Sequence, residues 1–368
     1  MRFMPVVALA ALLVPVPAAA QDYACAVPAS AQAPQVAEEV SQLRSFATGS
    51  GITVAVIDTG VAAHPELRRL RGGRDFVGED PLFDCDSHGT VVAGVIAGAT
   101  TGIAPGAEVV SVRQTSAHYR DSPGEESAAG NLRTLAEAIH NALDEGARVI
   151  NISVVSCVDP GLAARIDDAV VRDALTRAER EGAVVVAAAG NASPDCEPGF
   201  TVYPAHYPTV LAVAARDDAH TVAGYSLGAT LSAEGHVAHA LSSRGAGWAD
   251  GTLANDGVRA YQGTSFAAPV VSGAVALLLS RHPHLSPAEV RELVHAAAQP
   301  GGGAVTPIAV LTQLRPDAVA ETPPLSVEPA DARVSRAGVR LGNLGVALLA
   351  AAALALAAAA TRRRSEYR

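Results

Sequence analysis

Short apolar runs alternate with longer segments of helical periodicity between residue 51 and about residue 300. The runs have the length of strands that are buried on both faces, and the segments between them repeat apolar residues every three or four positions. The pattern predicts an α/β fold with a mainly parallel central sheet covered by helices on both faces. The predicted strands are residues 52–57, 108–112, 148–152, 183–188 and 210–214. The predicted helices are residues 90–99, 132–145, 163–181 and 283–298, the last with Ser286 as N-cap and Pro287 at its first position.

Two further apolar segments lie at the ends of the chain. Residues 1–20 combine Arg2, an apolar run and a final Ala18-Ala19-Ala20, which predicts a signal peptide cleaved after Ala20. Residues 341–361 are uncharged and mostly apolar, and as a helix they would span about 30 Å, the thickness of a hydrocarbon core. A Pro-rich linker at 315–340 precedes this predicted transmembrane helix, and the alternative is a buried helix of the globular part. The arginines of the tail, 362–368, predict that the tail is cytoplasmic and that the part of the chain before the membrane helix lies outside the cytoplasm.

Composition narrows the function classes. All 27 basic residues are arginine, so chemistry based on a lysine Schiff base is excluded, and the net charge of −10 argues against nucleic-acid binding. The four cysteines, Cys25, Cys85, Cys157 and Cys196, can form disulfides in an exported protein, with three possible connectivities. No Cys-x-x-Cys pair and no Asp-rich calcium loop occurs in the sequence, so we expect no metal site.

Three short segments carry candidate chemistry. An apolar strand ends in Asp58-Thr59-Gly60, His88 opens a helix of small residues, and Gly263-Thr264-Ser265 opens a second such helix. The carboxyl ends of parallel strands meet at one edge of a sheet, where these side chains would gather. Asp, His and Ser can act as orienting acid, base and nucleophile. The alternatives are a simple N-cap role for Ser265 and His64 as the base.

These segments resemble the signatures of the subtilisin-like serine proteases, or subtilases: D-T/S-G, H-G-T-x-V-A-G and G-T-S-M/F-A-A-P. A fourth signature, A-A-G-N, is matched by residues 188–191. The resemblance implies a subtilisin-like three-layer fold and a serine endopeptidase with an Asp58–His88–Ser265 triad and no cofactor. It also implies that Asn191 binds the oxyanion and that His64 has a structural role. The segment Ala233-Glu234-Gly235 departs from the A-P-G of many subtilases.

The strand at 148–152 continues into a segment that resembles the substrate-binding strand of subtilases. Most subtilases continue S-L-G-G at this point, whereas this chain has Ser153-Val154-Val155-Ser156. Ser153, Val154 and Val155 are therefore the candidate substrate-binding residues. A branched side chain at 155 in place of glycine predicts a narrowed pocket that prefers small residues before the cleaved bond.

The whole layout resembles the mycosins, membrane-anchored subtilases associated with type VII secretion. It consists of a signal peptide, an arm at 21–50, a protease domain at 51–314, a linker, one membrane helix and a basic tail. The resemblance implies disulfides Cys25–Cys85 and Cys157–Cys196, a protein or peptide substrate, and association with the type VII secretion complex of the cell membrane. The arm is too short for an independently folded inhibitory prodomain, so we expect it to act as a strap. The alternative function is a structural component that caps the secretion complex, with proteolysis secondary.

Overall fold

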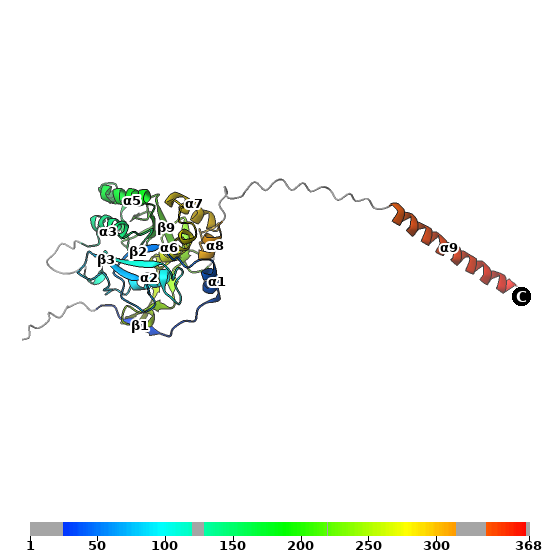
Figure 1. The fold of residues 1–368 in the computed structure, drawn as a ribbon, viewed down its shortest axis with the longest axis horizontal. Helices are drawn as coiled ribbons and strands as arrows, with labels where there is room; N and C mark the ends of the chain where they lie inside the picture. The colour runs from blue at the N-terminus through cyan, green and yellow to red at the C-terminus, as the bar shows by residue number, and fades with distance from the viewer. Residues whose placement is uncertain (1–24, 120–128, 219, 314–335, 366–368) are drawn as a thin grey trace, which may run out of the picture. The chain divides into compact units, whose positions relative to one another are not determined.

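The computed structural model describes residues 25–119, 129–218, 220–313 and 336–365 (Figure 1). It divides the chain into a unit that ends at residue 314 and a C-terminal unit that begins at residue 315. The predicted signal peptide and residues 315–335 of the predicted linker lie outside the described residues.

A seven-stranded sheet forms the centre of the first unit. Its strand order is β10-β9-β7-β5-β2-β4-β3, and every neighbouring pair is parallel. The strands are β2 (Thr53–Asp58), β3 (Leu70–Asp75), β4 (Glu108–Arg113), β5 (Val149–Ile152), β7 (Val184–Ala188), β9 (Val210–Arg216) and β10 (Leu231–Glu234). All five predicted strands are present. The two that the sequence did not predict, β3 and β10, lie at the edges of the sheet. Their sequences, LRGGRD and LSAE, contain no apolar run that would have marked them as strands.

Alternate side chains of the strands point to opposite faces and build two separate cores. Val54 and Val56 of β2 belong to the core on the side of α2 (Gly89–Ala97) and α6 (Thr264–Arg281). Ala55 and Ile57 belong to the core on the side of α3 (Leu132–Asp144) and α5 (Ala169–Glu181). In Figure 1, α3 and α5 lie together, away from α7 (Pro287–Ala297) and α8 (Pro307–Thr312). The predicted three-layer α/β fold is confirmed.

The helix boundaries follow the capping residues. Ser286 caps α7 and forms a capping box with Glu289, as the sequence predicted. The start predicted for the helix at residue 163 was wrong, because α5 begins at Ala169 and the short α4 (Pro160–Ala163) precedes it. Asp167 accepts a hydrogen bond from the N–H of Ala169 at 3.1 Å, so a turn separates the two helices.

The N-terminal arm is fastened to the globular unit at both ends. Its strand β1 (Pro28–Ala31) pairs antiparallel with β13 (Trp248–Ala254) in a second sheet. That sheet also contains β11 (His236–Val237), β12 (Ala240–Leu241) and β14 (Gly257–Gln262). The disulfide Cys25–Cys85 holds the start of the arm. In α1 (Glu38–Phe46), Arg44 donates to the carbonyls of Thr100 and Gly102 at 2.9 and 3.0 Å. These contacts are the ones expected of a strap.

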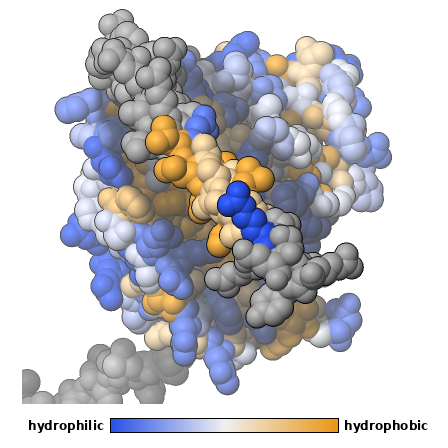
Figure 2. Space-filling model, turned by 90° about the vertical axis from the view of Figure 1, so that its right-hand side faces the viewer, coloured by the Kyte–Doolittle hydropathy of each residue, from blue (hydrophilic) through white to orange (hydrophobic). Residues whose placement is uncertain are grey.

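The C-terminal unit contains one long helix, α9 (Arg336–Ser365). Its segment Gly342–Ala360 is a candidate membrane span, and none of that segment is buried. Figure 2 colours the side chains along this helix mostly orange and pale, which marks apolar residues. Helix α6 also passes the test of length and composition, but 78% of it is buried as a core helix of the first unit. Helix α9 begins before the predicted span, so residues 336–340 of the predicted linker are helical.

Candidate active site

Asp58 and His88 form a hydrogen-bonded pair at the carboxyl edge of the sheet. Asp58 is the last residue of β2 and is fully buried. Its Oδ1 accepts from His88 Nδ1 at 2.6 Å and from the N–H of Thr59 at 2.8 Å. Because Nδ1–H of the neutral imidazole donates to the carboxylate, Nε2 is left as the acceptor, the atom that a general base uses.

The surroundings of His88 favour its protonated form. Burial by itself would lower the pKa of His88, but the charge of Asp58 and the hydrogen bond to it act in the opposite direction. The charges of Asp84 and Asp86 add to this effect, and the pKa of His88 is raised above its usual value.

Ser265 is the second residue of α6, and its carbonyl is left without a partner inside the helix. That partner would be the N–H of residue 269, but Pro269 has none. The hydroxyl of Ser153 donates to this carbonyl at 2.7 Å. In return, the hydroxyl of Ser265 donates to the carbonyl of Ser153 at 3.0 Å. The two serines therefore fasten the start of α6 to the segment that follows β5.

His88 and Ser265 line the same cleft, which has a volume of about 510 Å³. Ser153, Val154 and Val155 line it too, and the ring of Phe266 lies 5.1 Å from the ring of His88. The Ser265 hydroxyl points to Ser153 and, among the described residues, makes no hydrogen bond to His88. Rotation about its Cα–Cβ bond redirects the hydroxyl, and hydrogen bonds of this kind often tighten only when substrate binds.

Asn191 lies beside the start of α6, just past the end of β7. The intervening Gly190 has a φ of +97°, a left-handed conformation that glycine adopts without strain. Asn191 Oδ1 accepts from the N–H of Thr264 at 3.0 Å and from its hydroxyl at 3.2 Å. These bonds orient the amide, and its Nδ2 group lies beside Gly263 and has no hydrogen-bond partner in the described part of the chain.

A series of buried hydrogen bonds that connects Ser153 to α6 was not predicted from the sequence. Asn151 Nδ2 donates to the hydroxyl of Ser153 at 2.9 Å, and Ser272 of α6 donates to Asn151 Oδ1 at 2.8 Å. Both Asn151 and Ser272 are fully buried. The signal available in the sequence was a polar residue in each of two otherwise apolar runs, since such residues require a partner when they are buried.

His64, the other histidine considered as the base, lies elsewhere. It is buried, its Nδ1 accepts from the N–H of Glu66 at 3.1 Å, and its Nε2 lies 3.0 Å from the carbonyl of Gly247. Both ring nitrogens thus have backbone partners, which is the structural role that we expected.

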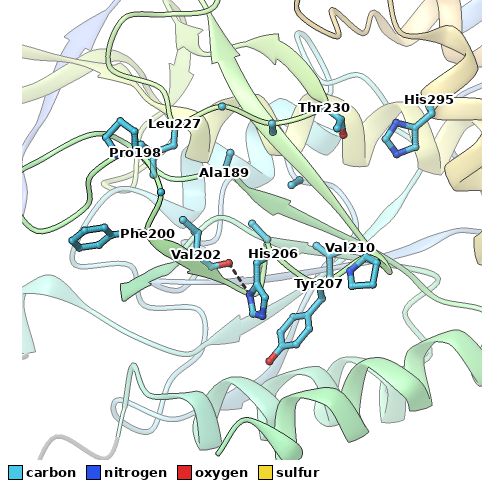
Figure 3. Close-up of a pocket in the computed structure, with 16 residues that line it drawn as sticks. Ala189, Pro198, Phe200, Val202, His206, Tyr207, Val210, Leu227, Thr230 and His295 are labelled. Atoms are coloured by element: carbon cyan, nitrogen blue, oxygen red, sulfur yellow. Dashed lines mark hydrogen bonds between the residues drawn. The ribbon is translucent and has the colours of Figure 1, made fainter. Parts of the chain in front are cut away.

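A second pocket of about 530 Å³ lies beside β8 (Thr201–Tyr203) and β9 (Figure 3). Phe200, His206, Tyr207 and His295 are among its lining residues. Its His206 Nδ1 lies 3.2 Å from the carbonyl of Val202, an interaction marked in Figure 3. None of the predicted catalytic residues lines this pocket, so the cleft with His88 and Ser265 is the candidate active site.

The predicted disulfides are both present. Cys157 of β6 (Ser156–Val158) is bonded to Cys196, which lies five residues after Asn191, and Cys25 is bonded to Cys85. No group of three or more potential metal ligands occurs in the part of the chain that the structure describes.

In this site a histidine is paired with a buried acid, and a serine at a helix start lines the same cleft. On a parallel sheet, this arrangement is typical of the subtilisin-type serine proteases. The chain belongs to the subtilase family (peptidase S8), whose sequence model matches residues 49–322. It is a serine endopeptidase of that family.

Within the family, the chain is similar to the mycosins. Mycosin-1 of Mycobacterium tuberculosis is 35% identical over 370 residues, covering 84% of this chain and 81% of the relative. Mycosin-1 of Mycolicibacterium smegmatis is 34% identical over 331 residues, covering 77% of this chain and 73% of the relative.

Solved structures agree with the sequence comparison. The MycP3 protease from the type VII (ESX-3) secretion system superposes with a TM-score of 0.71 at 31% identity, covering 79% of this chain and 93% of that chain. A chain in an intact ESX-5 inner membrane complex gives a TM-score of 0.70 at 31% identity, covering 90% of this chain and 93% of that chain. The predicted subtilisin-like fold and the similarity to mycosins are confirmed.

Proposed function

We propose that this protein is a membrane-anchored endopeptidase that cleaves a protein or peptide outside the cytoplasm, using Asp58, His88 and Ser265 as its triad. The observation that carries the proposal is the 2.6 Å bond between His88 and the buried Asp58, in the cleft that Ser265 also lines. This pair prepares a neutral imidazole that can accept a proton, and the serine supplies the nucleophile.

The reaction is acyl transfer to water in two steps. His88 Nε2 takes the proton of the Ser265 hydroxyl as the oxygen attacks the scissile carbonyl, and His88 then protonates the leaving amine. Water, activated by the same imidazole, hydrolyses the acyl-enzyme. Asp58 holds the tautomer and orientation of His88 and stabilises its cation while the charge is present.

Two donors are available for the oxyanion of the tetrahedral intermediate. One is Nδ2 of Asn191, oriented by the bond between its Oδ1 and Thr264. The other is the N–H of Ser265, which as a first-turn group has no acceptor inside α6. Donors fixed before the reaction stabilise the developing charge more than mobile water does.

The test of the proposal is covalent labelling with a fluorophosphonate probe. The full chain in detergent is expected to be labelled, and a Ser265→Ala variant is expected to lose the labelling completely. Labelling that persists in the variant would mean that another residue is the nucleophile. Absence of labelling in a folded wild-type chain would contradict the proposed site.

The substrate pocket supports a preference for small residues before the cleaved bond. Val155 lines the cleft and packs against a small apolar cluster of Cys196, Val202 and Leu227. Cys157, disulfide-bonded to Cys196, packs there as well. The side chain of Val155 is therefore held in place by the cluster, which supports the proposal that it narrows the substrate pocket.

A peptide library would measure this preference. The wild-type chain is expected to cleave after small residues, and a Val155→Gly variant is expected to accept larger ones because the side chain that narrows the pocket is gone. A wild-type profile dominated by large residues, unchanged in the variant, would contradict the pocket assignment.

Helix α9 supports the proposed membrane anchor, and the similar proteins support a link to secretion. Its exposed apolar segment has the length of a membrane span, and the arginines that follow favour a cytoplasmic tail and an extracytoplasmic protease. The similar chains of ESX-3 and ESX-5 support association of this protein with a type VII secretion complex of the cell membrane.

A structural role in that complex is the second candidate, and the similarity to a chain of an intact ESX-5 inner membrane complex favours it. The Ser265→Ala chain separates the two functions. If secretion depends on proteolysis, cells that carry the variant lose secretion. If they secrete normally while losing cleavage, the chain acts in secretion mainly as a structural component.

A further inference from the structure

Asp84 is a buried acid that was not among the predicted site residues. It lies in the loop between β3 and α2, four residues before His88, and only 6% of it is exposed. A buried carboxylate is costly unless hydrogen bonds satisfy its oxygens. Its partners therefore indicate what the group does.

Each oxygen of Asp84 contacts a different part of the active site. Oδ1 accepts from the hydroxyl of Thr59 at 2.9 Å, and Thr59 directly follows Asp58. Oδ2 accepts from the N–H and the hydroxyl of Thr90, at 2.9 and 2.6 Å, and Thr90 lies two residues after His88. One side chain thus joins the strand end that carries the acid to the helix start that carries the base.

The two threonines extend this connection. The hydroxyl of Thr59 accepts from the N–H of Gly89 at 3.0 Å, and the hydroxyl of Thr90 accepts from the N–H of Ala62 at 2.9 Å. A hydroxyl has one proton to donate, and the Thr59 hydroxyl lies closer to Asp84, at 2.9 Å, than to Asp58, at 3.3 Å. The Thr90 hydroxyl lies 2.6 Å from Asp84. Because a carboxylate only accepts, both threonine hydroxyls donate their proton to Asp84. Their oxygens then accept from the N–H groups of Gly89 and Ala62.

We propose that Asp84 is a positioning residue that holds Asp58 and His88 in register and adds its negative charge to the field that acts on His88. The proposal rests on the catalytic roles proposed above for Asp58 and His88. This role explains the presence of Asp84 close to the buried Asp58, although the two negative charges repel each other.

The electrostatics agree with this role. Burial, together with the charge of Asp58, raises the pKa of Asp84 to about 6, against the opposing effect of its hydrogen bonds from Thr90 and Thr59. The titratable groups that face it are Asp58 from β2, His88 from the same loop and Tyr261 from β14. The charge of Asp84 helps to raise the pKa of His88, so removal of that charge lowers the pKa of His88.

The test is an Asp84→Asn substitution in the full chain, with Glu79→Gln as the matched control. Asparagine keeps the shape of the side chain, but its amide group has one oxygen and cannot accept hydrogen bonds from both threonines. Glu79 lies in the same loop and contacts neither threonine. We expect kcat for a small activated ester to fall about 10- to 100-fold with little change in KM, because misplaced catalytic groups slow the chemical step. We also expect the acid limb of kcat/KM to move to lower pH, which a purely structural role would not cause.

A second pair of variants covers the case in which Asp84→Asn does not fold. Thr59→Val removes the hydroxyl that links Asp84 to Gly89 while keeping the shape, and Thr59→Ser keeps the hydroxyl. We expect kcat to be reduced in the valine variant and largely recovered in the serine variant. Equal kcat in the two variants would overturn the proposal.

The labelling experiment separates failure of this inference from failure of the proposed function. If the folded wild-type chain is not labelled by the fluorophosphonate, the proposed site itself is wrong. If the wild-type chain is labelled and Asp84→Asn has unchanged kcat and an unmoved acid limb, Asp84 is not a positioning residue, whatever its effect on stability.

Discussion

At Ser265 the backbone of α6 leaves two groups without partners inside the helix, and each has a separate use. The N–H is one of the free donors of the first turn, and the preceding N–H, that of Thr264, donates to Asn191. The carbonyl is free because Pro269 has no N–H, and Ser153 donates to it at 2.7 Å. Pro269 thus leaves free the carbonyl through which Ser265 is fastened to the segment that follows β5.

The raised pKa of His88 leads to a prediction for the pH dependence of activity. Only the neutral imidazole can act as the base, so activity is lost as the pH falls through the pKa of His88. We expect the acid limb of kcat/KM to lie above 6.5, the ordinary value for histidine, because the charges of Asp58, Asp84 and Asp86 outweigh the effect of burial. The measurement is the initial rate of ester hydrolysis across the acid and neutral range.

An Asp86→Asn variant tests the cause of this shift. It removes one of the charges that raise the pKa of His88, so the limb should move to lower pH. A wild-type limb below the ordinary histidine value, or a limb that moves upward in the variant, would contradict the electrostatic account.

At the scale of elements, the register of α6 against β5 depends on a few polar contacts within apolar surroundings. Leu277, Leu278 and Leu279 contribute burial, which is non-directional, whereas the bond from Ser272 to Asn151 fixes one relative position. Because Asn151 also donates to Ser153, the same contact determines where the start of α6 meets the cleft.

We predict that Ser272→Ala destabilises the protein by about 1–3 kcal/mol, since Asn151 Oδ1 is left buried without a donor. The control is Ser280→Ala in the same helix, where the lost bond is from the Ser280 hydroxyl to the carbonyl of Leu277 near the surface, and little change is expected. Denaturant unfolding of the two variants measures the difference. Equal losses would show that the buried contact has no special weight.

At the scale of the whole molecule, the two units place their apolar side chains differently. The first unit buries its apolar side chains in two cores on either side of the sheet. Helix α9 exposes them instead, with Leu349 and Leu356 74% and 73% exposed. A continuous exposed apolar surface of this kind is stable in a hydrocarbon phase and unfavourable in water.

We predict that the full chain remains in the membrane fraction after alkaline carbonate extraction, whereas a chain that ends at residue 335 is released. The matched control replaces Leu349 and Leu356 by Asp in the full-length chain, which removes the apolar span without shortening the protein. Release of the wild-type chain, or retention of both variants, would contradict an anchoring role for α9.

The sequence by itself determined the class of the protein. The apolar runs specified five of the seven sheet strands, because strands buried on both faces need such runs. Asp58, His88 and Ser265 were identified because each stands in a short segment whose local conformation, a strand end or a helix start, is encoded nearby. The elements that were missed, β3 and β10, are edge strands with little apolar signal. The early start predicted for α5 ignored the turn in which Asp167 accepts from the N–H of Ala169.

The tertiary structure decided which distant polar groups meet. Ser272 and Asn151 are 121 residues apart in the chain, and Thr59 and Asp84 are 25 apart. No local preference of the backbone encodes such a contact, since it exists only after the helices have packed on the sheet. The same reason applies to Val155, whose support by the cluster around Cys196 depends on the folded arrangement. The proposed reacting groups could be identified from short local sequence segments, whereas the contacts that hold these groups in place depend on tertiary packing.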